Sequence, residues 1–84
     1  MSKFFIVETK YVGPTNTRGS RITASMMDKS ARCTVSYDYA MNGDLNHTMA
    51  AQELMKRVFK DGNFMNAGYA DTKNGYAFVY SARY

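Results

Sequence analysis

Hydrophobic and polar residues alternate along the first half of the chain in the pattern of β-strands. Residues 4–12 are rich in β-branched and aromatic side chains, and strict alternation follows over 21–27 and 32–39. The residues expected to face inward in the last two segments are Ile22, Ala24, Met26, Cys33, Val35, Tyr37 and Tyr39. Alternation with a period of two predicts consecutive strands of an antiparallel sheet that is covered on one face. The intervening segments 13–20 and 28–30 are predicted to be a loop and a turn.

Apolar residues recur at spacings of three and four from His47 to Lys60. This spacing places them in one stripe and predicts an amphipathic helix. Asp44 or Asn46 is expected to cap its first turn, because short polar side chains accept hydrogen bonds from the first backbone amides. Gly62 follows the helix and suits a left-handed residue after its last turn. His47 is then expected to be a solvated residue at the start of the helix.

Two more β-rich runs, 65–72 and 76–82, follow the helix and flank Lys73-Asn74-Gly75. Asn-Gly between such runs is a strong signal for a tight hairpin. The predicted order is β-β-β-α-β-β, which indicates an α+β fold in which an antiparallel sheet of four to five strands carries one helix on one face. With 84 residues, the chain is expected to form a single domain over 1–84 around one small core.

Composition narrows the possible chemistry, because the chain contains one cysteine and one histidine. These residues cannot assemble a disulfide framework or the usual tetrahedral zinc site. Cys33 lies on the predicted apolar face and is expected to be a buried structural thiol; a Cys33–His47 nucleophile pair is the catalytic alternative. The carboxylates of the second half are scattered among turns. We therefore expect a protein that is not an enzyme, with no catalytic residues, no metal site and no cofactor.

The distribution of apolar residues also bears on location. No apolar run is longer than five residues, and the N-terminus lacks the stretch of a signal peptide. We therefore expect a soluble protein of a reducing cytoplasm that does not bind membranes.

Net charge is +4, and the excess is concentrated in the first 32 residues, which hold six basic and two acidic side chains. The remainder of the chain is balanced. A local positive field attracts polyanions such as nucleic acid, or an acidic protein surface. The alternative is that the charge only keeps the protein in solution.

The polar loop between the first two predicted strands combines glycine, hydroxyl and guanidinium groups. Gly13 and Gly19 allow backbone amides to point into one concavity as an anion-binding nest. Hydroxyl groups and arginines in the same segment can donate to phosphate oxygens. The residues predicted to contact nucleic acid or another anion are Thr15, Asn16, Thr17, Arg18, Ser20 and Arg21 of the loop, together with Lys10 and Arg32. Lys3 and Lys29 are expected to add to the field. The alternative is an ordinary hairpin loop with a solvated Arg18.

Seven tyrosines and five phenylalanines offer a second kind of nucleic-acid contact. Exposed rings beside basic residues stack on unpaired bases in several small β-rich folds. The candidates are Phe4, Tyr11, Tyr37, Tyr39, Tyr76, Tyr80 and Tyr84. The alternative places the tyrosines at the rim of the core with their hydroxyls in water, and buries Phe5, Phe59, Phe64 and Phe78. The sheet face without the helix serves equally well as a homodimer interface.

Two motifs resemble a group of small uncharacterised proteins encoded by bacteriophages and plasmids. The first is Thr15-Asn16-Thr17-Arg18-Gly19-Ser20-Arg21-Ile22, which is similar to that group's Thr-Asn-x-basic-Gly-Ser-Arg motif. The second is Tyr37-Asp38-Tyr39-Ala40-Met41-Asn42, which is followed by Asn46-His47 and Ala50-Ala51. The resemblance spans about residues 9–60. It implies an origin in a mobile element and a bacterial cytoplasmic setting, and it assigns no role to any residue.

Together these observations predict a small basic binding protein that contacts the phosphate backbone of nucleic acid through the loop at residues 15–21. The alternative is a phage-encoded interaction factor that binds and inhibits a host enzyme or defence complex. A third hypothesis is a self-associating structural protein.

Overall fold

The computed structural model describes residues 2–26 and 31–83, and within them it has five strands and one helix. In chain order the elements are β1 (Ser2–Val12), β2 (Arg21–Met26), β3 (Arg32–Ser36), α1 (Gly43–Val58), β4 (Phe64–Asp71) and β5 (Gly75–Arg83). No helix within these residues has the length and apolar character needed to cross a membrane. The turn predicted at 28–30 lies outside the described residues, as do Lys29 and Tyr84.

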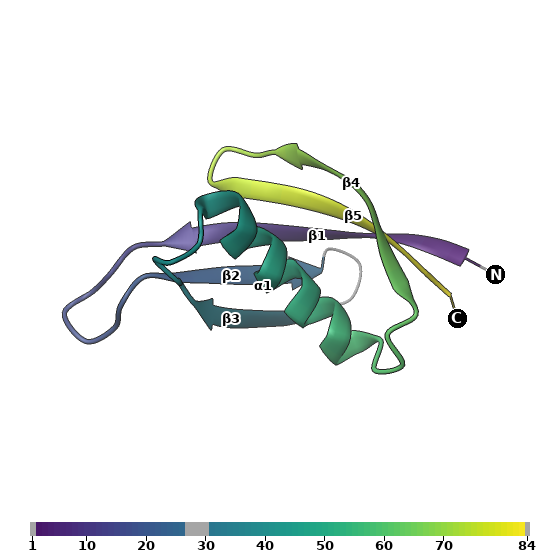
Figure 1. The fold of residues 1–84 in the computed structure, drawn as a ribbon, viewed down its shortest axis with the longest axis horizontal. Coiled ribbons are helices and arrows are strands. Elements are labelled where there is room, and N and C mark those ends of the chain that lie inside the picture. The colour runs from purple at the N-terminus through teal and green to yellow at the C-terminus, as the bar shows by residue number, and fades with distance from the viewer. Residues whose placement is uncertain (1, 27–30, 84) are drawn as a thin grey trace.

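All five strands form one antiparallel sheet in the order β3-β2-β1-β5-β4. The helix α1 lies across one face of this sheet, over β1, β2 and β3 (Figure 1). The predicted α+β class, with an antiparallel sheet and one helix packed on it, is therefore confirmed. The first and last strands lie side by side at the centre, in register from Ser2 opposite Arg83 to Lys10 opposite Gly75.

Alternation along the central strands decides which side chains enter the core. Cross-strand neighbours share a face of the sheet, so Val7 points toward the helix together with its partners Met26 and Phe78. The buried apolar residues are Phe5, Val7, Ile22, Ala24, Met26, Cys33, Ala50, Ala51, Leu54, Met55, Phe78, Tyr80 and Ala82. No helix of the described residues lies on the opposite face of the sheet, where Phe4 and Met65 are 65% and 71% exposed.

The helix begins at Gly43, four residues before the predicted start, and Asn42 caps it by accepting a hydrogen bond from the Leu45 amide at 2.8 Å. The predicted caps, Asp44 and Asn46, are wrong because both residues lie inside the helix. The Asn46 side chain instead binds the segment that precedes the helix. Its Oδ1 accepts from the amide of Asp38 at 2.8 Å, and its Nδ2 donates to the carbonyl of Asp38 at 2.9 Å.

These bonds explain why β3 ends at Ser36, three residues before its predicted end. Both backbone groups of Asp38 are paired with the Asn46 amide, so they are not part of a strand ladder. Tyr37 is half-buried against the core, but Tyr39 has left the sheet and is 76% exposed. The prediction that Tyr39 faces inward is therefore wrong.

His47 faces the sheet, so the prediction of a solvated position is wrong. The residue is 6% exposed, and its Nδ1 lies 2.7 Å from the hydroxyl of the fully buried Thr9. Because the helix begins early, His47 sits in its second turn and shares the buried stripe with Ala51 and Leu54. Burial lowers the pKa of His47, and the negative charge of Asp44 opposes part of this change.

The predicted hairpin between β4 and β5 is confirmed, with the Thr72 amide donating to the Gly75 carbonyl at 2.9 Å. Within the described residues, a positive φ occurs only at Gly62 (76°) and Gly68 (153°). The hairpin turn therefore does not use the left-handed conformation for which Asn-Gly is favoured. Gly62 has the left-handed conformation that the sequence predicts after the helix, and Gly68 lies opposite Val79 at an irregularity in β4.

Candidate nucleic-acid interface

The loop 13–20 connects β1 to β2 and projects beyond the end of the sheet (Figure 1). Two hydrogen bonds between the same two residues close its tip. The Thr15 amide donates to the Arg18 carbonyl at 2.7 Å, and the Arg18 amide donates to the Thr15 hydroxyl at 3.1 Å. The side chains of Asn16, Thr17 and Arg18 are exposed around this closed turn. The loop thus presents its guanidinium group and hydroxyl groups to solvent.

The amide nest expected from the two glycines of this loop is not formed. Neither Gly13 nor Gly19 has a positive φ, which is the conformation that lets successive amides converge. The amides of Thr15 and Arg18 also bond within the loop. Anion contacts at this loop must therefore come from side chains.

Ser20 anchors the base of the loop. It is buried, and its hydroxyl oxygen accepts hydrogen bonds from the hydroxyls of Tyr11 at 2.9 Å and Tyr39 at 2.6 Å. Its carbonyl accepts from the amide of Tyr37 at 3.0 Å. Because these contacts surround Ser20, its role in the structure is to fix the loop to β1 and to the segment after β3. The Ser20 hydroxyl is therefore engaged within the fold and is not among the anion contacts proposed below.

The three tyrosines around Ser20 form a continuous aromatic cluster. The rings of Tyr11 and Tyr37 meet edge to face at 5.5 Å between centroids, and those of Tyr37 and Tyr39 lie 5.0 Å apart. Such tilted arrangements are favoured by the charge distribution of aromatic rings. The Tyr39 ring is at the outer end of the cluster. An exposed ring is thus held in place directly beside the loop.

A groove of about 440 Å³ runs between the loop and the end of β3. Its lining residues are Thr17, Arg18, Gly19, Ser20, Arg21, Thr34, Val35, Ser36, Tyr37 and Tyr39. Guanidinium groups and an exposed aromatic ring therefore border the same hollow. Sequence reasoning found the loop residues and proposed the tyrosines, but it could not show that Thr34 and Ser36 lie beside them, because the pairing of β2 with β3 sets that position.

The positive charges of the groove are not neutralised by internal ion pairs. Neither Arg18 nor Arg21 makes an ion pair with a described acidic residue, whereas Arg57 on α1 pairs with Glu53 at 3.4 Å. Arg18 is exposed, and the half-buried Arg21 donates from Nη1 to the Gly19 carbonyl at 3.4 Å. Both guanidinium groups keep donors that are available to an anion.

The other predicted basic residues are at different distances from the loop. Lys10 and Arg21 lie on the same face as diagonal neighbours across β1 and β2, which places them about 7–8 Å apart. Arg32 pairs with Ser25, and Ser25 lies four residues, or about 13 Å, along β2 from Arg21. Lys3 lies at the far end of β1, with its Nζ 5.5 Å from the Phe5 ring centroid. The structure therefore brings Lys10 to the loop, whereas Arg32 and Lys3 lie away from it.

Among the other aromatic candidates, Tyr80 is part of the core. It is 1% exposed, and its buried hydroxyl has no hydrogen-bond partner among the described residues. The predictions that Tyr80 stacks on bases and that its hydroxyl reaches water are both wrong. Burial raises the pKa of Tyr80, and a polar contact with the side chain of its cross-strand neighbour Asn66 opposes part of the rise without having the geometry of a hydrogen bond. Phe5 and Phe78 are buried as predicted, whereas Phe59 and Phe64 are only partly buried and pack against the core.

Tyr76 is tied to the first turn of the helix. Its hydroxyl donates to the carboxylate of Asp44, and this bond raises the pKa of Tyr76 to about 12. Its ring meets the His47 ring edge to face at 4.9 Å. Tyr76 is thus held against α1, away from the groove that the loop borders.

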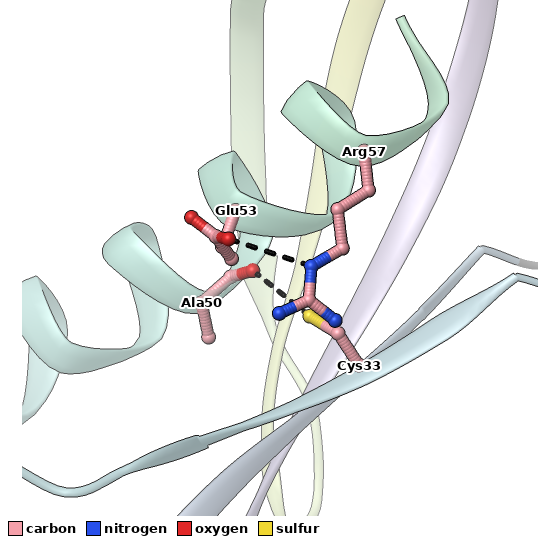
Figure 2. Close-up of polar contacts among 4 residues, drawn as sticks. All are labelled: Cys33, Ala50, Glu53 and Arg57. Atoms are coloured by element: carbon pink, nitrogen blue, oxygen red, sulfur yellow. Dashed lines mark hydrogen bonds and ion pairs between the residues drawn. The ribbon is translucent and has the colours of Figure 1, made fainter. Parts of the chain in front are cut away.

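The thiol and the imidazole considered as a catalytic pair have separate partners. Cys33 lies on β3 and faces α1, where its Sγ lies 3.8 Å from the Ala50 carbonyl. Figure 2 shows this contact together with the ion pair between Arg57 and Glu53 on the same helix. Burial raises the pKa of Cys33, with Arg57 opposing part of the rise, so the thiol stays protonated and is a poor nucleophile. His47 bonds to Thr9 instead. Within the described residues, no three His, Cys, Asp or Glu side chains are grouped to hold a metal ion.

Comparison of the chain with protein-family models, with curated proteins and with solved structures finds no match. The resemblance to bacteriophage and plasmid proteins therefore stays a prediction.

Proposed function

We propose that this protein is a small non-enzymatic binding protein that contacts the phosphate backbone of nucleic acid through the loop at residues 15–21. The supporting observation is that Arg18 and Arg21 border one groove and make no ion pair with any described acidic residue. Guanidinium groups donate to phosphate oxygens through two parallel N–H groups, which makes arginine well suited to this contact. Lys10 adds charge from the neighbouring position on β1. The resemblance of the loop motif suggests a bacterial cytoplasm as the setting.

Contacts of this kind release counterions, so affinity falls as salt rises. The slope of log K against log salt is about −0.9 per phosphate contacted on duplex DNA and about −0.7 on a single strand. Replacing Arg18 and Arg21 together by Ala is therefore expected to weaken binding to all sequences alike. It is also expected to flatten the slope by about 1.8 on duplex DNA, since two contacts are lost.

The test is fluorescence anisotropy of labelled single-stranded and duplex oligonucleotides between about 50 and 200 mM salt. A Lys56→Ala/Lys60→Ala variant is the matched control, because it removes the same charge from exposed positions near the end of α1. The proposal requires the arginine pair to matter and the lysine pair to matter much less. Equal effects of the two variants would show that binding depends on net charge and not on this loop. An unchanged salt slope in the arginine variant would refute the proposed site.

A second candidate function, protein binding, is favoured by the sheet face opposite the helix. Phe4 and Ile6 of β1 and Met65 of β4 are exposed there, and β5, with Val79 on the same face, lies between these two strands. An apolar surface of this kind suits a protein partner such as a host enzyme, or a second copy of the chain. Light scattering detects a dimer formed with a second copy. A pull-down that recovers one host protein after nuclease treatment would favour this function over nucleic-acid binding, provided that a Phe4→Ser/Met65→Ser variant no longer recovers that protein.

A further inference from the structure

We infer that the groove prefers unpaired over paired nucleic acid, with one base stacked on the Tyr39 ring while Arg18 and Arg21 hold the adjoining phosphates. This inference rests on the proposed function, because it names the form of nucleic acid that the same site accepts. It is carried by an exposed aromatic ring that lines the groove together with both guanidinium groups.

The Tyr39 ring is fixed although it is largely in solvent. Its hydroxyl donates to Ser20 at 2.6 Å, and its ring packs on Tyr37 at 5.0 Å between centroids. One end of the ring is therefore held by a hydrogen bond and one side by an aromatic contact. Stacking on a ring that is already oriented loses little side-chain entropy, so the contact contributes more to affinity than a free surface tyrosine would.

Unpaired bases fit this arrangement because their flat faces are accessible. In a duplex the bases stack on one another, and a protein reaches them only at their edges. A single strand exposes the base faces, which stack on aromatic side chains whatever the base. The groove supplies what this mode requires, namely a ring for the base and cations for the backbone. Thr34 and Ser36 add hydroxyl groups within the same hollow, and Ser36 is the cross-strand partner of Arg21.

The experiment compares oligo-dT and oligo-U of about twelve nucleotides, within the site sizes of small single-strand binding domains, with a duplex of the same length. Wild-type protein is expected to bind at least one single strand about tenfold more tightly than the duplex. Tyr39→Ala is expected to weaken single-strand binding about 5- to 150-fold, the range found for loss of one stacked base, and to change duplex binding less than about twofold. The strand that binds more tightly shows whether the preferred nucleic acid is DNA or RNA.

Two controls separate stacking from other effects of the substitution. Tyr69→Ala removes a ring that is 64% exposed on β4, away from the groove, and is expected to leave single-strand binding unchanged. An oligonucleotide with abasic sites has no base to stack, so Tyr39→Ala should weaken its binding less than about twofold. Thermal melts check that each variant is folded.

The outcomes distinguish this inference from the proposed function. Equal binding of single strand and duplex, unaffected by Tyr39→Ala but weakened by the double arginine substitution, overturns the stacking inference and leaves the phosphate contact standing. Binding that ignores both Tyr39→Ala and the arginine substitution overturns both. An equal effect of Tyr39→Ala on intact and abasic strands also overturns the inference, because the ring would then act without a base.

Discussion

Gly75 is the position at which a single methyl group should do the most damage to this fold. It begins β5 and packs directly on the central strand β1. A Cβ atom built on Gly75 lies 2.0 Å from the carbonyl oxygen of Thr9, 2.8 Å from its carbonyl carbon and 3.0 Å from Cε1 of His47. The nearest atoms are backbone, so no side-chain rotation relieves the overlap. Replacement by Ala must instead push β5 away from β1.

The size of the effect follows from these distances. The new methyl group must separate from the Thr9 oxygen by about 1.4 Å to reach 3.4 Å, where ordinary contact begins. Overpacking of a well-packed site costs about 1–3 kcal/mol. The shift also strains the 2.7 Å contact between Thr9 and His47 and the 3.2 Å bond from the Tyr11 amide to the Asn74 carbonyl. Each such bond contributes about 1 kcal/mol, so we expect Gly75→Ala to lower the free energy of unfolding by about 3–5 kcal/mol.

The assay is thermal and urea unfolding followed by circular dichroism. A loss of about 3 kcal/mol or more is expected to lower Tm by at least about 12 °C in a domain of this size. Gly19→Ala is the matched control, because its Cβ would meet no atom within 4 Å and its φ is not positive. It should change stability by less than about 0.5 kcal/mol, as most surface substitutions do. A Gly75→Ala protein that melts within about 2 °C of wild type would refute the close approach of β5 to β1.

Three further predictions test other parts of the structure. Asn42→Ala should lower the free energy of unfolding by about 1 kcal/mol through loss of the helix cap, measured by urea unfolding, and an unchanged midpoint would contradict the observed helix start. Tyr80→Phe removes a buried hydroxyl without a hydrogen-bond partner and should raise Tm slightly or leave it unchanged; a fall of several degrees would show that the hydroxyl is bonded. Burial lowers the pKa of His47 below 6.5, so the unfolded chain binds the proton more readily than the folded chain. The resulting contribution to stability is present above pH 6.5 and is lost as the pH falls through the pKa of the folded state. Urea unfolding between about pH 7.5 and 5 should show a smaller loss for His47→Asn than for wild type, and equal losses would rule out this source of the pH dependence.

Local pattern was enough to predict the elements but not their partners. Alternation identified β2 and β3, and the spacing of apolar residues identified α1, because burial on one face imposes a period on each element. The β-branched and aromatic composition of residues 4–12 identified β1. The pairing of β1 with β5 joins residues at opposite ends of the chain, and periodicity carries no information about which strands are neighbours. The close approach at Gly75 depends on that pairing. It therefore could not be anticipated from Asn-Gly, which predicted only the turn.

The errors around the groove have a common origin in one side chain. Asn46 was predicted to be a helix cap because asparagine is common there, but its amide pairs with the Asp38 backbone instead. That pairing accompanies the early end of β3 and the exposure of Tyr39. Alternation alone placed Tyr39 in the core. The aromatic content also made Tyr39 a stacking candidate, and the choice between the two predictions depends on a contact between residues eight positions apart in the chain.

The hydrogen bonds within and below the loop bear directly on whether so few groups can bind a nucleic acid. Two arginines and one ring are comparable with the contacts of non-specific binding, for which Kd is about 10⁻⁴–10⁻⁶ M at physiological salt. Fixing one backbone residue costs about 1–2 kcal/mol, so ordering a free eight-residue loop on binding would cancel such an affinity. The turn between Thr15 and Arg18, and the hydrogen bonds to Ser20 from the Tyr11 hydroxyl and the Tyr37 amide, meet that cost during folding and do not depend on the Tyr39 side chain. A preordered loop is therefore a physical requirement of the proposed function, and the structure has the contacts that would provide it.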